Sequence, residues 1–188
     1  MDNFQLEPGN LTNQRGHLIG GVSGAMTNIA TSGDVYGLQV ASGRPLVLPR
    51  LAIKAACTEA FAAAQSLAFG VWKVTGFTAI HDTGSPKTIA SKQKHAATGD
   101  ALSGVNVRIS GTAAISNATY TAVDADEPLI VAMGEVSTTP SCLEVWTPGP
   151  GKLPIVLSPN EGLIIRPLIA IANDGTVLLW VGADVQRD

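Results

Sequence analysis

Charged side chains are scarce in this chain of 188 residues. Asp, Glu, Lys and Arg make up 14% of it and apolar residues 45%, whereas the usual charged share is about a quarter. So neutral a surface is typical of a protein whose flanks are covered by neighbours, although a monomer with a Ser, Thr, Asn and Gly surface fits the same composition. The net charge of −3 gives no basic footprint for nucleic acid or anionic lipid.

Cysteine and targeting segments are sparse too. Cys57 and Cys142 are far apart and have no metal-ligand spacing, so we expect two buried free thiols. The first residues lack the basic start and apolar stretch of a signal peptide, and no window is long and apolar enough to cross a membrane. We therefore expect a soluble protein made in a reducing cytoplasm, with no membrane partner.

Helical periodicity and internal repeats are missing, and the chain reads instead as short strands separated by turn residues. Many short strands at this spacing, without a βαβ rhythm, predict an all-β fold, an antiparallel sandwich or barrel. The runs with period-2 alternation or with turn residues at their ends are 67–72, 105–110, 153–157, 163–166 and 177–185.

The composition and periodicity of the chain change near residue 35. Residues 1–34 are rich in Gly, Asn, Thr and Ser and have no sustained periodicity. We expect them to form an irregular N-terminal arm or loop-rich lead-in, which lies along a neighbour or frays. Residues 35–188 are expected to form a single β-sandwich domain.

Three local features within that domain carry expectations of their own. Residues 57–69 have high helix propensity from their alanines but no stop signal, so helix is the lesser alternative to strand. Pro49 interrupts an apolar run and predicts a bend or an edge strand. Asp174-Gly175 lies between two apolar runs and predicts a hairpin turn.

The stretch Asp82-Thr83-Gly84-Ser85 matches the tetrapeptide around the catalytic aspartate of pepsin-like proteases. Such an enzyme needs two aspartates that share a proton, and the chain has a single DTG, so a homodimer would have to supply the second. The residues that flank the motif, His81 and Pro86, do not provide the apolar strand that it requires. We therefore interpret the stretch as a surface turn, with a homodimeric protease using Asp82 as the remote alternative.

The histidines and the glycine-rich turn give no complete site either. His17, His81 and His95 are expected to be exposed or partly satisfied loop histidines, because no serine elbow accompanies them and no helical pair suits a metal. The turn at residues 149–152 resembles a phosphate loop but lacks the Ser or Thr after its lysine.

The tryptophans are the last candidates for a binding site. Trp72, Trp146 and Trp180 lie in apolar runs, so we expect them in the sandwich core rather than on a carbohydrate-binding platform. We therefore expect no catalytic, cofactor-binding or metal-binding residues in this chain.

Two blocks of the sequence carry a resemblance to a known family. The first is FTAIHDTGS (77–85), followed after a variable loop by GVNVRISGTAAIS (104–116), and the second is PGPGKLPIVLSPNEGLIIRPLIAIANDGTVLLWVGADV (148–185). In this order they resemble small virion structural proteins of tailed bacteriophages, of the capsid decoration or cement type. The N-terminal region does not align with that family, and Pro167 departs from its pattern.

The resemblance implies a jelly-roll-like β-sandwich without enzymatic activity. Such a protein is made in the host cytoplasm and binds the major capsid protein on the virion surface, typically as a homotrimer that stabilises the shell. Asn160-Glu161-Gly162 is the most specific part of the resemblance, and we expect Gly162 to adopt a backbone conformation closed to residues with a Cβ. A tail- or spike-associated β-module that binds a host surface glycan is the alternative interpretation.

Overall fold

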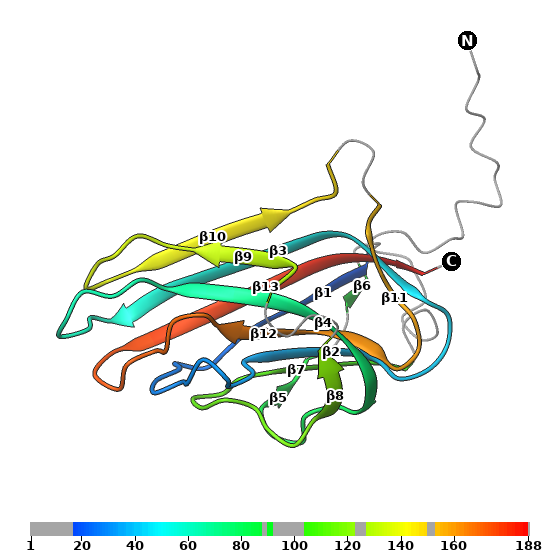
Figure 1. Cartoon of the computed structure of the whole chain (residues 1–188), viewed down its shortest axis with the longest axis horizontal. Helices are drawn as coiled ribbons and strands as arrows, with labels where there is room; N and C mark the ends of the chain where they lie inside the picture. Colours follow the sequence, from blue (N-terminus) through cyan, green and yellow to red (C-terminus); the bar gives the residue numbers. More distant parts are fainter. Residues whose placement is uncertain (1–16, 88–89, 92–103, 123–126, 150–152, 188) are drawn as a thin grey trace, which may run out of the picture.

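Two antiparallel sheets pack face to face in the computed structural model of the chain (Figure 1). The structure describes residues 17–87, 90–91, 104–122, 127–149 and 153–187. These ranges contain no helix. The predicted all-β sandwich is therefore confirmed.

The first sheet contains six strands in the order β10-β3-β13-β1-β6, and β11 pairs with the beginning of β3. All its strand pairs are antiparallel, and the long central strands β3 and β13 run side by side for most of their length. The bounds are β1 (His17–Val22), β3 (Leu46–Glu59), β6 (Ala90–Ser91), β10 (Ser141–Trp146), β11 (Ile155–Leu157) and β13 (Thr176–Arg187).

The second sheet contains seven strands in the order β5-β7-β2-β12-β4-β8, and β9 pairs with the beginning of β4. The predicted strands over 67–72, 105–110 and 163–166 all belong to this sheet. The bounds are β2 (Tyr36–Val40), β4 (Ala68–Ala79), β5 (Ser85–Pro86), β7 (Val105–Ile109), β8 (Thr119–Ala122), β9 (Ile130–Met133) and β12 (Glu161–Pro167).

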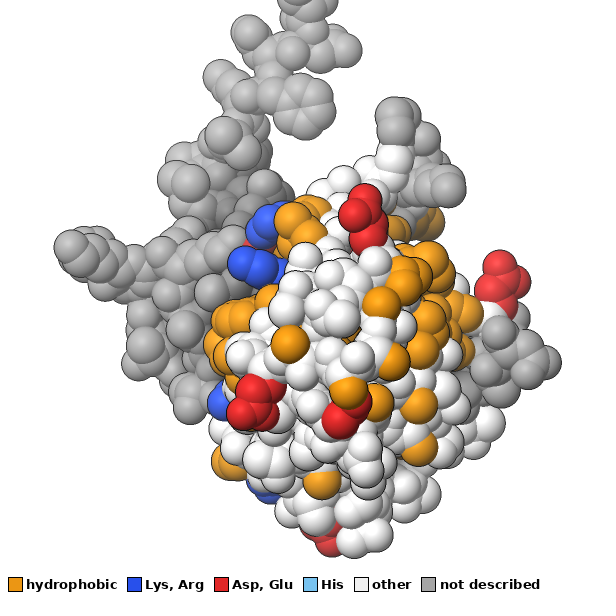
Figure 2. All heavy atoms as spheres, turned by 90° about the vertical axis from the view of Figure 1, so that its left-hand side faces the viewer, with side chains coloured by type: hydrophobic (Ala, Val, Ile, Leu, Met, Phe, Trp, Pro, Cys, Tyr) orange, Lys and Arg blue, Asp and Glu red, His pale blue; other side chains and the backbone are white. Residues whose placement is uncertain are grey.

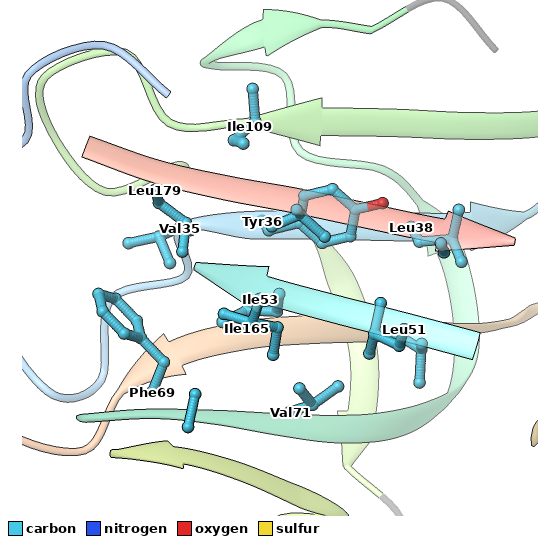
Figure 3. Close-up of a cluster of buried hydrophobic side chains, with 14 of the residues drawn as sticks. Val35, Tyr36, Leu38, Leu51, Ile53, Phe69, Val71, Ile109, Ile165 and Leu179 are labelled. Carbon is cyan, nitrogen blue, oxygen red and sulfur yellow. The ribbon is translucent and has the colours of Figure 1, made fainter. Parts of the chain in front are cut away.

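The main hydrophobic core fills the space between the two sheets. Alternate side chains of each strand point inward, as the period of two residues requires, and the aliphatic and aromatic groups of both sheets interdigitate (Figure 3). The labelled members from the second sheet and the segment before it are Val35, Tyr36, Leu38, Phe69, Val71, Ile109 and Ile165, and those from the first sheet are Leu51, Ile53 and Leu179.

Residues 17–34 belong to the sandwich, so the boundary expected after residue 34 does not match the structure. Strand β1 pairs with β13 along its whole length, and Met26 and Ile29 are fully buried in the core. The period-2 signal is hidden there because Gly20 and Gly21 occupy two of the six positions of β1. The remainder of the expected arm, residues 1–16, lies outside the described residues.

Residues 57–69 form no helix. They comprise the end of β3, a loop and the start of β4. The loop is held by tertiary contacts: the N–H of Phe61 donates to the carbonyl of Thr138, and Gln65 forms a bridge with Ser137. Burial of Phe61 and these hydrogen bonds outweigh the helix propensity of the alanines, because propensity is a weak preference that packing overrides.

Pro49 lies inside β3, at a bend rather than on an edge strand. The pairing of β3 with β13 shifts register next to it, between Asp184 and Gln186. The outer partner of β3 also changes there, from β11 before Pro49 to β10 after it. A proline cannot donate to a ladder, so it fits this irregularity, and the predicted bend is confirmed.

The hairpin predicted at Asp174-Gly175 is wrong. The strand before it, β12, ends at Pro167 in the second sheet, whereas β13 belongs to the first. The connection therefore crosses between the sheets. A Cβ on Gly175 would lie 2.5 Å from the ring of Phe61, so close packing explains this glycine without a hairpin turn.

Candidate functional site

A cluster of four polar side chains lies on the outer side of the second sheet, with Asp34 and His81 buried and Tyr120 and Arg166 partly buried. Asp34 precedes β2, His81 follows β4, Tyr120 lies in β8 and Arg166 in β12. Nε2 of His81 lies 2.7 Å from Oδ2 of Asp34, and Nε of Arg166 lies 2.6 Å from Oδ1. The hydroxyl of Tyr120 donates to Asp34 and accepts from Arg166 at 2.6 Å. One carboxylate thus joins four segments of the chain.

The charges of this cluster stabilise one another. Burial alone would raise the pKa of Asp34, but hydrogen bonds from His81, Tyr120 and Arg166, together with the charge of Arg166, lower it below its ordinary value. Burial would likewise lower the pKa of Arg166, yet the carboxylate of Asp34 raises it. Burial and the same carboxylate raise the pKa of Tyr120. Asp34 and Arg166 are therefore a paired anion and cation at neutral pH.

A second, smaller hydrophobic cluster surrounds the polar one. Trp72, Val74, Phe77 and Ile164 are buried there, on the side of the second sheet that faces away from the main core. The ring of Phe77 makes edge contacts with His81 and Tyr120, at centroid distances of 6.0 and 5.3 Å. The segment after β4 and the segment before β8 therefore lie over the outer side of the second sheet, and we call them the cover. As a result, β2 and β12 are buried on both faces.

The position of His81 corrects the expectation of an exposed loop histidine, because its side chain is only 1% exposed. In a Ser-His-Asp triad, one ring nitrogen binds the aspartate and the other faces a nucleophile. Here Nδ1 has no hydrogen-bond partner among the described residues. It lies so close to Gly37 that a Cβ there would be 2.6 Å away. His81 therefore anchors the cover, and no substrate atom can reach it in this conformation.

The other two histidines give no further information on a site. His17 begins β1, where it pairs with Val185, but its side chain is outside the described part of the structure. His95 lies wholly outside the described residues.

The stretch 82–85 is an exposed turn, as predicted. Oδ2 of Asp82 accepts a hydrogen bond from the amide of Asn117 at 2.8 Å, and the hydroxyl of Thr83 accepts from the N–H of Ser116 at 2.8 Å. Gly84 has a φ of +80°, and a Cβ on it would overlap Ile115. These two hydrogen bonds connect the turn at 82–85 to the loop that contains Ser116 and Asn117. One oxygen of the Asp82 carboxylate therefore has an amide as its partner.

The glycine of Asn160-Glu161-Gly162 is required for a reason different from the one expected. In this turn Asn160 has a positive φ, of 64°, and Gly162 does not. A Cβ on Gly162 would instead lie 2.1 Å from the carbonyl oxygen of Leu38 and 2.5 Å from Phe77. Close packing between β12, β2 and the cover therefore excludes a side chain at position 162.

The three tryptophans do not share a surface. Trp72 is buried in the second cluster instead of the main core, and the Arg166 guanidinium lies 5.8 Å from its ring. Trp146 is partly buried against the main core. Trp180 lies half-buried on the outer side of the first sheet, with Nζ of Lys54 at 5.4 Å. The expected burial is therefore confirmed for Trp72, although in the second cluster, and wrong for Trp180, and these three indoles form no flat row.

The remaining candidate groups offer no chemistry of their own. Both cysteines are free; Cys142 is buried and Cys57 half-buried, and burial raises the pKa of both thiols. Of the phosphate-loop-like turn, residues 150–152 lie outside the described residues. The described ranges contain no group of three or more His, Cys, Asp and Glu residues suited to a metal ion, and no helix with the length and apolar character to cross a membrane.

Exposed hydrophobic side chains gather along β9 and the loop that follows it. We call this set the β9 ridge: Leu129, Val131, Met133 and Val136, which are 50%, 40%, 66% and 71% exposed. Strand β9 lies at an edge of the second sheet, beside the beginning of β4. Figure 2 shows one end of the molecule, where hydrophobic side chains gather at the upper right with few charges among them. Exposed apolar patches larger than a few hundred Å² often mark interaction surfaces, so the β9 ridge is a candidate for one.

Sequence reasoning missed the polar cluster because its members converge from distant segments. Asp34 is separated from His81, Tyr120 and Arg166 by 47, 86 and 132 positions, so no spacing rule connects them. The available signal was a charged residue inside an apolar strand, at Arg166. Comparison of the chain with protein-family models, with curated proteins and with solved structures finds no match.

Proposed function

We propose that this chain is a non-enzymatic structural protein of a tailed-bacteriophage virion, of the capsid decoration or cement type. It binds the shell of major capsid protein on its outer surface and stabilises it against the pressure of packaged DNA. The resemblance in residues 77–185 suggests this class, and it further suggests a jelly-roll-like connection of the strands and a homotrimer.

The observation that carries the proposal is the β9 ridge. Four large apolar side chains stand exposed within residues 129–136, whereas Asp34 and His81 of the polar cluster are buried in the fold. A protein that acts by covering a surface needs exposed apolar contacts of this kind, and burial of about 1,600 Å² in total is typical of a specific interface. Many weak contacts of the same type add up across a shell through multivalency.

The test is binding to shells that lack the protein. Particles of the encoding phage assembled without this chain are mixed with the purified protein, separated on a density gradient and assayed for bound copies and for heat resistance. We expect wild-type protein to cosediment and to raise the temperature at which DNA is released. Val131→Glu places a charge in the ridge and should weaken binding at least about 100-fold, whereas the exposed control Glu59→Gln should bind normally.

The alternative functions receive less support from the geometry. A glycan-binding tail or spike module was expected to present exposed, coplanar tryptophans, but Trp72 and Trp180 lie on opposite outer sides of the sandwich. A homodimeric aspartic protease would need Asp82 to share a proton with its copy in an enclosed site, but Asp82 lies on an exposed turn. Neither site is ready for its chemistry in this structure.

A further inference from the structure

The two central strands of the first sheet carry apolar residues on both sides, mixed on the outer side with Lys54 and, at one end, with Arg50 and Asp184. Ile53 and Leu179 point into the core, and the residues next to them that point outward include Ala52 and Trp180. An antiparallel sheet with one face in water normally alternates apolar and polar side chains. Apolar residues on both faces are typical of strands that are covered on both sides.

The second sheet has the same pattern, and there the chain supplies its own cover. Ile164 of β12 points away from the main core and is fully buried by the second cluster. On the first sheet, the outward side chains of Leu143, Val145 and Val22 are 63%, 43% and 41% exposed. Among the described residues, nothing covers this outer face.

The outer face consists of two neighbouring rows that cross four strands. The register of β10, β3, β13 and β1 aligns the four residues of each row. We call them the large row, which is Leu143, Lys54, Trp180 and Val22, and the small row, which is Val145, Ala52, Gly182 and Gly20.

We propose that this outer face binds the same face of a second copy of the chain. A two-fold axis that runs across the strands, midway between the rows, places the large row of one copy over the small row of the other. The rows are two residues, or about 7 Å, apart along the strands, and packed sheets lie about 10 Å apart. Trp180 then lies over Gly182 of the second copy, and Lys54 over Ala52 of the second copy. Bulky groups meet small ones, as interdigitated sheets require.

The size of the face fits this occupant. Four strands about 4.8 Å apart and about seven residues long give a contact that buries on the order of 1,000 Å² in total, near the lower limit for a specific interface. The ammonium group of Lys54 is held against the Trp180 ring at 5.4 Å. Arg50 and Asp184 lie 3.9 Å apart at one end of the face, where an ion pair can stay in water. The contact is isologous, so it closes on itself as a pair.

The pairing does not depend on the proposed binding to a shell. It predicts an even number of copies: two if pairing is the sole contact, or six if the homotrimers proposed above also form. Sedimentation equilibrium of the full-length protein distinguishes these states. Two or six copies is the expected result, and one or three copies in the wild type would overturn the inference, including the case in which residues 1–16 of the same chain cover the face.

Substitutions at one position of the small row locate the contact. Ala52→Lys brings an ammonium group from each copy against Lys54 of the other copy, inside the contact, and should raise the Kd for pairing at least about 100-fold. Ala52→Ser keeps a small neutral side chain and should pair normally. Circular dichroism and thermal unfolding check the fold, and Leu143→Lys, at a more exposed position, replaces Ala52→Lys if that variant does not fold.

A control substitution on the second sheet distinguishes failure of the proposed pairing from failure of the proposed binding to shells. Val131→Glu changes the β9 ridge, so it should leave pairing unchanged while it weakens binding to shells. Unchanged pairing of both Ala52→Lys and Leu143→Lys would show that the outer face is not the contact. Loss of pairing in Val131→Glu would assign the contact to the ridge instead.

Discussion

Nε2 of His81 lies 2.7 Å from Oδ2 of Asp34, and both side chains are almost completely buried. This contact fixes the segment after β4 to the segment before β2, on the outer side of the second sheet. Because Arg166 and Tyr120 bind the same carboxylate, the cover and the sheet are held by one anion. The stability of the cover should therefore depend on that anion more than on any other polar group.

Removal of the charge at position 34 tests this dependence. Asp34→Asn leaves Arg166 partly buried without its counter-ion, and loss of one partner of a buried pair costs about 3–5 kcal/mol. We expect the free energy of unfolding in urea at pH 7 to fall by about that amount. Asp82→Asn makes the same change at an exposed carboxylate and should cost less than about 1 kcal/mol. Equal losses in the two variants would contradict the role of Asp34.

The same carboxylate predicts a dependence on pH. The folded pKa of Asp34 lies below its unfolded value, which is about 3.9. Its contribution to stability is therefore complete above the unfolded pKa and is lost as the pH falls through the folded pKa. Unfolding measured from pH 6 to pH 2 should show that wild type and Asp34→Asn converge at acid pH. A constant difference between them across this range would contradict the pKa assignment.

A fully buried hydroxyl group gives a prediction of increased stability. The hydroxyl of Tyr36 has no hydrogen-bond partner among the described residues, and burial raises the pKa of this phenol. An unsatisfied buried polar group costs about 1–3 kcal/mol. Tyr36→Phe should therefore raise the free energy of unfolding by about 1 kcal/mol. Tyr120→Phe, which loses two hydrogen bonds, should lower it, and the reverse order of the two variants would be inconsistent with the structure.

Close packing at position 162 predicts a large effect of one methyl group. A Cβ there would lie 2.1 Å from the backbone oxygen of Leu38, which cannot move without disturbing the pairing of β2 and β12. Gly162→Ala should cost about 3 kcal/mol, at the upper end for overpacking. Gly111→Ala is the matched control, because a Cβ at that position meets nothing within 4 Å. Thermal unfolding of both variants measures the difference.

The sequence predicted those parts of the fold in which local pattern and tertiary role coincide. The alternation at Phe69 and Val71 predicted β4, and the apolar run around Ile165 predicted β12. Strand β1 was missed because Gly20 and Gly21 interrupt its pattern, although backbone hydrogen bonds to β13 need no side chains. The Asp174 hairpin was wrong because turn residues specify a local bend and not the sheet that the next strand joins.

The sequence predicted the candidate surfaces less well than it predicted the strands. The low charge content indicated covered flanks, but it did not identify which faces are exposed. That information comes from register, which aligns Leu143, Lys54 and Trp180 in one row. The buried partner of His81 was equally hidden, because an aspartate 47 positions away has no sequence signal that links it to the histidine.

The most direct test of the proposed function is a cryo-electron microscopy reconstruction of purified virions of the encoding phage. The account predicts density for a β-sandwich of this shape at many equivalent positions on the outside of the shell, with the β9 ridge turned toward the major capsid protein. Virions that contain no copy of the chain, or copies confined to the interior of the shell, would contradict it.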